Sequence, residues 1–373
     1  MLNNKADPNI CYEEKSPLYS ASCHGYTEIV KLLLNNKADP DICYREKSPL
    51  YSASFHGHKE VVELLLNNKA DPNKCCEGES SLYSASLQGH TEIVELLLDN
   101  KADPNICYEG ESPVYSASLE GHTEIVKLLL NNKADPNICY EEKSPLYSAS
   151  VHCHKDVVEL LLHNKADPNI CCKEKSPLHT ASNQAYTEIV ELLLNNKSDP
   201  NKCCEGESPL YSASLQGHTE IIELLLNNKA DPNICSEGES PLYSASVHGH
   251  KEVVELLLNN KADPNICCKG ESPLYSASVH GHKEVVKLLL NNKADPNICY
   301  EGESPIYRAS CCGYTEIAKL LLNNKADPNI CYDEKSPLHS ASVHGHKEVV
   351  ELLLNNKADP NICWEDGESR AVR

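Results

Sequence analysis

A 32-residue unit recurs along almost the whole chain without a change of phase. A Ser-Pro-Leu-Tyr-Ser-Ala-Ser segment, or a close variant of it, marks each copy. Ser81 replaces the proline in one copy, so eleven copies lie in register, with prolines at Pro17, Pro49, Pro113, Pro145, Pro177, Pro209, Pro241, Pro273, Pro305 and Pro337. A fixed period of this length is typical of a solenoid, in which each unit packs only on its neighbours. Solenoids usually bind other macromolecules, and catalysis by them is rare.

Composition argues against several classes of function. The net charge of −21 makes the array acidic, and an acidic surface repels phosphate backbones, so we expect no binding to nucleic acid. No apolar run approaches the roughly 18 residues of a membrane span. The first residues, Met1 to Lys5, lack the apolar core of a secretion signal. We therefore expect a cytoplasmic chain, with the nucleus as the alternative compartment, and no cofactor.

The 20 cysteines raise the question of a disulfide framework. Twelve of them recur at the repeat period, from Cys11 to Cys363. Stacked helical units lie about 10 Å apart, whereas a disulfide requires two Cα atoms within about 7 Å. We therefore expect that neighbouring cysteines of this series do not bridge, and that they are free thiols in a reducing compartment.

Residues 16 to 47 represent one unit. Ser16 is a good helix N-cap and Pro17 suits the first helical position, so a short first helix is predicted there. Gly25 is predicted to end this helix, because glycine tolerates positive φ. A second helix is predicted over residues 27–34, where the apolar residues follow helical spacing. An Ala-Asp-Pro-Asp turn and an extended loop complete the unit.

This unit resembles the ankyrin repeat. The family pattern Thr-Pro-Leu-His-x-Ala appears here as Ser-Pro-Leu-Tyr-Ser-Ala, and the histidine is kept at His179 and His339. A Gly-His pair stands between the helices, for example at Gly57-His58, and the Leu-Leu-Leu and Ala-Asp-Pro-Asn segments follow in the family's order. The resemblance covers residues 1–363.

The resemblance implies an all-α fold, namely an ankyrin-type α-solenoid of stacked helix-turn-helix units joined by short hairpin-like loops. It divides the chain into a partial repeat at residues 1–15, an array of eleven repeats at residues 16–362, and a partial repeat or tail at residues 363–373. Neither end matches a polar capping repeat. The function implied is that of a non-catalytic scaffold or adaptor for a protein partner.

Two features depart from the family pattern. The unit is one residue shorter than the family's roughly 33, and we expect the missing residue within the loop at residues 41–48. The usual glycine after the second helix is Lys37 and its equivalents, so either this lysine or Asn36 must adopt a left-handed conformation at a cost of about 1 kcal/mol. Two copies also lose the glycine between the helices, at Cys153 and Ala185.

Partner contacts are expected where residues vary while the frame stays fixed. The last two residues of the first helix vary in this way, and in ankyrin proteins the matching positions line the concave face. The candidates are His24, Phe55, His56, Leu87, Gln88, Leu119, Glu120, Val151 and His152. A second variable series occupies the loop tips, at Tyr44, Tyr108, Tyr140, Tyr300 and Tyr332. We expect a monomer that binds a protein whose contact surface is basic or apolar, because tyrosine and apolar side chains supply contact area.

Other chemistry is weakly indicated. His-Gly-His occurs four times and could in principle bind zinc, but the second histidine belongs to the repeat pattern and no Cys-x-x-Cys pair supports a metal, so no metal site is predicted. Vicinal cysteines such as Cys311-Cys312 are the best candidates for reversible oxidation. A metal- or redox-responsive array remains an alternative function. A duplicated fragment of a larger ankyrin protein, with an effector domain elsewhere, is another.

Overall fold

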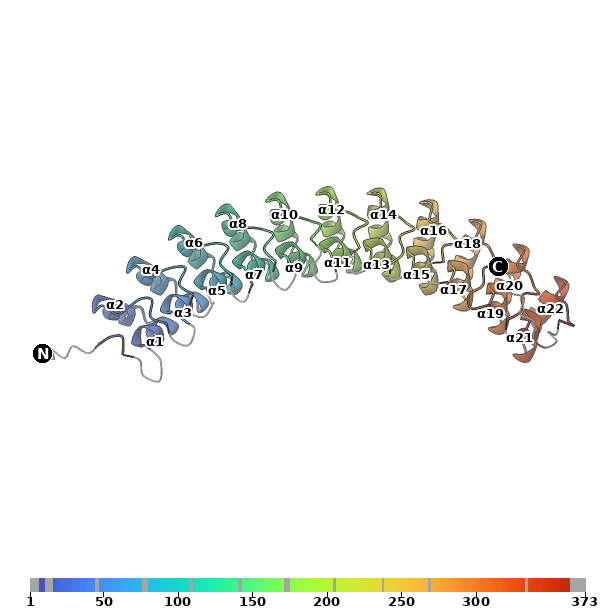
Figure 1. Cartoon of the computed structure of the whole chain (residues 1–373), viewed down its shortest axis with the longest axis horizontal. Coiled ribbons are helices and arrows are strands. Elements are labelled where there is room, and N and C mark those ends of the chain that lie inside the picture. The colour runs from blue at the N-terminus through green and yellow to red at the C-terminus, as the bar shows by residue number, and fades with distance from the viewer. Residues whose placement is uncertain are drawn as a thin grey trace. The chain divides into compact units, whose positions relative to one another are not determined.

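The computed structural model describes residues 7–10, 16–43, 47–75, 80–107, 110–139, 143–170, 175–203, 206–236, 238–267, 270–332 and 335–362. In these ranges the regular structure is 22 α-helices, two for each repeat (Figure 1). They are α1 (Pro17–Cys23), α2 (Thr27–Asn35), α3 (Pro49–Phe55), α4 (Lys59–Asn67), α5 (Ser81–Gln88), α6 (Thr91–Asp99), α7 (Pro113–Leu119), α8 (Thr123–Asn131), α9 (Pro145–Val151), α10 (Lys155–His163), α11 (Pro177–Asn183), α12 (Thr187–Asn195), α13 (Pro209–Gln216), α14 (Thr219–Asn227), α15 (Pro241–His248), α16 (Lys251–Asn259), α17 (Pro273–Val279), α18 (Lys283–Asn291), α19 (Pro305–Cys311), α20 (Thr315–Asn323), α21 (Pro337–Val343) and α22 (Lys347–Asn355). The predicted all-α fold of helix pairs is confirmed.

The chain forms two compact units. One comprises residues 1–181 with 191–198, and the other comprises residues 182–190 with 199–373. Within each unit the odd-numbered first helices pack on one another, as α3 does on α5 and α13 on α15. The even-numbered second helices likewise form their own row, as α6 packs on α8 and α14 on α16. Within each unit, the repeats joined by these contacts thus pack on their sequence neighbours, as in a solenoid.

A serine cap starts each first helix. In α7, the Ser112 side chain accepts a hydrogen bond from the Tyr115 backbone N–H at 3.2 Å, and Pro113 fills the first helical position. This bond satisfies one of the N–H groups that a helix start leaves without a partner. The same bond occurs at Ser16, Ser48, Ser80, Ser144, Ser176, Ser208, Ser240, Ser272, Ser304 and Ser336. The predicted cap is confirmed in all eleven repeats.

The second helices supply most of the core. In α6, Ile93, Val94, Leu97 and Leu98 are buried, whereas Glu95 is exposed and Leu96 is half-buried. Full burial of one such side chain stabilises the fold by about 1.5–3 kcal/mol. No helix in the ranges that the structure describes is long and apolar enough to cross a bilayer.

A lysine in the left-handed conformation ends each second helix. Lys133 has a φ of 69°, whereas Asn132 has a φ of −93°. The Lys133 N–H donates to the Leu130 carbonyl and the Ala134 N–H donates to the Leu129 carbonyl, each at 3.0 Å, which is the pattern of a Schellman motif. The equivalent lysines behave alike, at Lys37, Lys69, Lys101, Lys165, Lys197, Lys229, Lys261, Lys293, Lys325 and Lys357. Of the two alternatives, the lysine rather than the asparagine carries the strain.

Replacing Lys133 with glycine is expected to raise the free energy of unfolding by about 1 kcal/mol, because glycine adopts positive φ without a steric penalty. Urea unfolding at constant pH measures the change. The matched control is Asn132→Gly, at a negative φ, which is expected to lower stability. Equal effects of the two substitutions would contradict this account of the helix end.

The turn between the helices brings neighbouring repeats together. Gly121 has a φ of 75°, and a Cβ at this position would lie 2.6 Å from the ring of His154. His154 Nε2 is 3.1 Å from the Leu119 carbonyl oxygen. Cys153 and Ala185 keep the same backbone conformation without glycine, with φ values of 60° and 58°. The same histidine-to-carbonyl contact recurs at His58, His90, His122, His218, His250, His282 and His346.

The cysteine series differs from expectation at two positions. Cys43 and Cys235 are disulfide-bonded, so the prediction that the whole series consists of free thiols is wrong. That prediction applied the spacing of stacked helices to residues that lie in the loops after α2 and α14, which need not keep that spacing. The other eleven cysteines among the described residues form no disulfide.

Candidate protein-binding surface

The variable pairs at the ends of the first helices form one row in the first unit. We call the first-helix face the surface made by residues 23–24, 55–56, 87–88, 119–120 and 151–152. These pairs end α1, α3, α5, α7 and α9, and each of these helices packs on the next. Figure 1 shows the five helices side by side. The structure therefore brings together the candidates that the sequence placed on these helices.

Burial alternates within each pair. The second residue is exposed in every case, at His24, His56, Gln88, Glu120 and His152. The first residue is half-buried, except for Phe55, which is 36% exposed. An exposed polar side chain beside a partly covered apolar one is the composition of many protein interfaces.

The backbone anchors the histidines of this face. His56 Nδ1 lies 2.8 Å from the Ser52 carbonyl oxygen, and His152 Nδ1 lies 2.9 Å from that of Ser148. His24 makes the equivalent contact. Because a carbonyl oxygen only accepts hydrogen bonds, Nδ1 carries the proton in each ring. Nε2 is therefore the nitrogen left to bond with a partner.

The His-Gly-His segments use ring nitrogens to hold the turn. His56 and His58 stack with ring centroids 6.0 Å apart, and His58 Nε2 lies 3.2 Å from the Cys23 carbonyl oxygen. The rings also stack in the other three segments, at His248–His250, His280–His282 and His344–His346. Within the described ranges, no group of three or more His, Cys, Asp or Glu side chains could hold a metal ion.

Two of the five loop-tip tyrosines are among the described residues. Tyr300 and Tyr332 belong to the second unit, where each is half-buried. Their rings lie 5.6 Å from those of Tyr275 and Tyr307, respectively, on α17 and α19. Their role in binding stays a prediction. The remaining three, Tyr44, Tyr108 and Tyr140, lie outside the described residues.

Tyrosine–glutamate hydrogen bonds link residues of neighbouring repeats, and sequence reasoning missed them. Tyr243 Oη donates to Glu271 at 3.1 Å, and Tyr275 Oη donates to Glu303 at 2.7 Å. Burial and the Glu271 carboxylate raise the pKa of Tyr243 to about 12, so the phenol keeps its proton. The available signal was the glutamate before the cap serine. The same bond links Tyr83 to Glu111 and Tyr211 to Glu239.

Arg308 is a second feature that the sequence reading missed. It occupies a first-helix position where the other ten repeats have serine or threonine, and it is the one arginine among the described residues. Its Nε lies 3.5 Å from a Glu303 carboxylate oxygen, with 30% of its side chain exposed. Alignment of the repeats with one another would have shown it.

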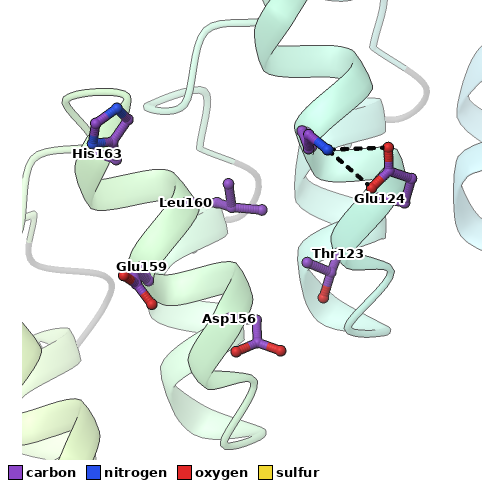
Figure 2. Close-up of a pocket in the computed structure, with 7 residues that line it drawn as sticks. Thr123, Glu124, Asp156, Glu159, Leu160 and His163 are labelled. Carbon is purple, nitrogen blue, oxygen red and sulfur yellow. Dashed lines mark hydrogen bonds and ion pairs between the residues drawn. The ribbon is translucent and has the colours of Figure 1, made fainter.

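A hollow of about 440 Å³ lies between α8 and α10 (Figure 2). Lys127 reaches Glu124 at 3.4 Å across one wall. Asp156 and His163 are departures from the repeat, which has glutamate and asparagine or aspartate at these positions. Three carboxylates against one lysine make the hollow negatively charged. It is lined by Thr123, Glu124, Lys127, Asp156, Glu159, Leu160 and His163.

Stacked helix pairs with a variable surface row define a class, the helical repeat proteins that bind other macromolecules. The family model of ankyrin repeats in three copies matches residues 1–75, 38–108, 82–172, 166–235, 229–300 and 296–362. This chain belongs to the ankyrin repeat family.

Similarity to individual proteins is more distant. Solved structures that match include the crystal structure of the human ASB11 ankyrin repeat domain, with a TM-score of 0.50 and 26% sequence identity. That match covers 58% of this chain and 100% of the solved domain. Comparison with curated proteins gives no significant match.

Proposed function

We propose that this chain is a non-catalytic scaffold or adaptor that holds a protein partner on its first-helix face. Ankyrin repeats are generally protein-interaction modules, and the family match extends over residues 1–362. The observation that carries the proposal is the row of exposed, variable side chains on a frame of identical caps and cores. A frame of this kind holds the contact residues rigidly, so little conformational entropy is lost on binding.

The partner that fits this surface is basic or apolar where it makes contact. Phe55, Leu87, Leu119 and Val151 offer apolar area, and the net charge of −21 attracts a basic protein and repels nucleic acid. One chain binds one partner in this proposal.

We place the chain in the cytoplasm, with the nucleus as the second candidate. The eleven cysteines among the described residues that form no disulfide support a reducing compartment. Cys43 and Cys235, which are disulfide-bonded, do not.

Affinity capture from a lysate of the source cells tests the binding face. The first bait is the unaltered chain. The second carries alanine at residues 55–56, 87–88, 119–120 and 151–152. We expect at least one protein to bind the first bait and to be lost from the second, because the exposed contact groups are removed while the buried core is unchanged.

A third bait controls for general damage. It carries alanine at Glu60, Glu92, Glu124 and Asp156, which are exposed on the second helices. This bait should retain the same protein. Loss of the protein from the third bait but not from the second would assign binding to the second helices and overturn the proposal. Retention of the same proteins on all three baits would also overturn it.

A further inference from the structure

The first repeat leaves an apolar helix face uncovered. On and beside α2, Tyr26 is 53% exposed, Ile29 is 47% exposed and Leu32 is 62% exposed. In the interior repeats, the residues equivalent to Ile29 are covered by the preceding repeat; Val61 is 1% exposed and Ile93 is 2% exposed. We call Tyr26, Ile29 and Leu32 the stripe. In each interior repeat, the equivalent surface faces the preceding repeat.

The last repeat leaves the opposite face uncovered. Leu354 on α22 is 47% exposed, whereas the equivalent Leu66 is 8% exposed and Leu98 is 7% exposed. Val343 at the end of α21 is 67% exposed. The two end faces are thus the two halves of one repeat-to-repeat interface.

Gly345 shows what is missing from the last repeat. A Cβ at Gly345 would meet nothing within 4 Å, whereas a Cβ at Gly281 would lie 2.9 Å from the ring of Tyr314 in the following repeat. The residue at the Tyr314 position of the first repeat is Tyr26. Tyr26 of a second copy could therefore cover Gly345 as Tyr314 covers Gly281.

Charges on the two faces are also complementary. Between interior repeats, Lys59 lies 3.2 Å from Glu92 and Lys283 lies 3.4 Å from Glu316. The last repeat carries a lysine at this position, Lys347, and the first repeat carries the matching glutamate, Glu28. Both are exposed, and Lys347 reaches only Glu351 within its own helix, at 3.6 Å.

From these observations we propose that the last repeat of one copy of this chain stacks on the first repeat of a second copy. The junction reproduces the contacts between interior repeats, with Lys347 on Glu28 and Leu354 against the stripe of Tyr26, Ile29 and Leu32. The contact is heterologous, because it joins two different faces of the chain. Each copy in a dimer therefore still has one unused face, so the assembly grows further unless it closes into a ring. The proposal goes beyond partner binding and departs from the monomer expected from sequence.

Stacking requires one local exchange. Asn9 Oδ1 accepts a hydrogen bond from the Asp39 N–H at 2.8 Å, as Asn329 does from Asp359 at 2.9 Å. Asn361 is the equivalent of Asn9 at the other end. In the assembly, Asn361 of the first copy takes the place of Asn9 of the second copy, so one such bond is lost and one is formed.

Sedimentation velocity of the 373-residue chain over a wide range of concentrations tests the proposal. We expect species larger than a monomer as concentration rises. Ile29→Glu with Leu32→Glu should raise the midpoint concentration by roughly tenfold or more, because both side chains are exposed in the single chain. In the junction Ile29 would be buried, as Val61 is, and Leu32 would be half-buried, as Leu64 is. Lys287→Glu, which changes the net charge by the same amount at an exposed position of α18 in an interior repeat, is the control and should leave the midpoint unchanged.

Charge reversal gives a second test that does not depend on apolar residues. Glu28→Lys alone should weaken association, and Glu28→Lys combined with Lys347→Glu should restore it. Circular dichroism confirms that each variant is folded. The proposal is overturned if the unaltered chain stays monomeric throughout, if the Ile29 and Leu32 variant associates like the unaltered chain, or if the double charge reversal fails to recover association.

Discussion

Replacing His179 with tyrosine is expected to remove about 2 kcal/mol of pH dependence from the free energy of unfolding between pH 7 and pH 5. His179 is 1% exposed on α11. Burial, with a smaller contribution from Lys175, lowers its pKa from 6.5 to about 4. Between these two pKa values the unfolded chain binds a proton that the folded chain does not. Stability is therefore lost as the pH falls from about 6.5 to about 4.

Urea unfolding at several pH values measures this effect. Tyrosine stands at this position in nine of the other ten repeats, so the substitution suits the fold. His339→Tyr in the last repeat is the matched control for the substitution itself, because His339 is exposed. An unchanged slope in the His179 variant would show that folding does not lower the pKa of this side chain.

Gly249→Ala is expected to cost about 3 kcal/mol of folding free energy. Gly249 has a φ of 71°, where an alanine is strained by about 1 kcal/mol. The added Cβ would also lie 2.6 Å from the ring of His282, and overpacking of this kind costs about 1–3 kcal/mol. The His282 ring would have to move and its contact with the Val247 carbonyl, now 2.9 Å, would lengthen.

Gly345→Ala separates the two contributions. Gly345 has nearly the same φ, 74°, but a Cβ there meets no atom within 4 Å. It should cost only the backbone strain of about 1 kcal/mol, so the two variants should differ by about 2 kcal/mol in thermal or urea unfolding. Equal costs would mean that the His282 ring moves aside at little energetic cost. Ala185 occupies the equivalent of the glycine position beside His218, so one repeat of the chain already has a Cβ there.

Much of the candidate surface could be predicted from sequence. The Ser-Pro cap fixes the start of each first helix, and the helical period then places residues such as Gln88 and Glu120 at its exposed end. Contacts between residues of neighbouring repeats could not be found in this way. Tyr275 and Glu303 are 28 residues apart, and only the stacking of α17 beside the following loop brings them within 2.7 Å. The hollow beside Asp156 depends in the same way on two packed helices.

The sequence by itself determined the repeat length, the two helices of each unit, their caps and the ankyrin family. These features are local, because a cap or a turn is decided by residues a few positions apart. Tertiary structure decided that Lys37 rather than Asn36 takes positive φ, since the chain must leave the helix in one direction to reach the next repeat. It also decided that Cys43 and Cys235 are disulfide-bonded and that Ile29 is exposed whereas the equivalent Val61 is buried. Each of these features depends on the atoms that a neighbouring segment brings close. The sequence of a repeat does not show which atoms those are, because nearly the same residues recur in every copy.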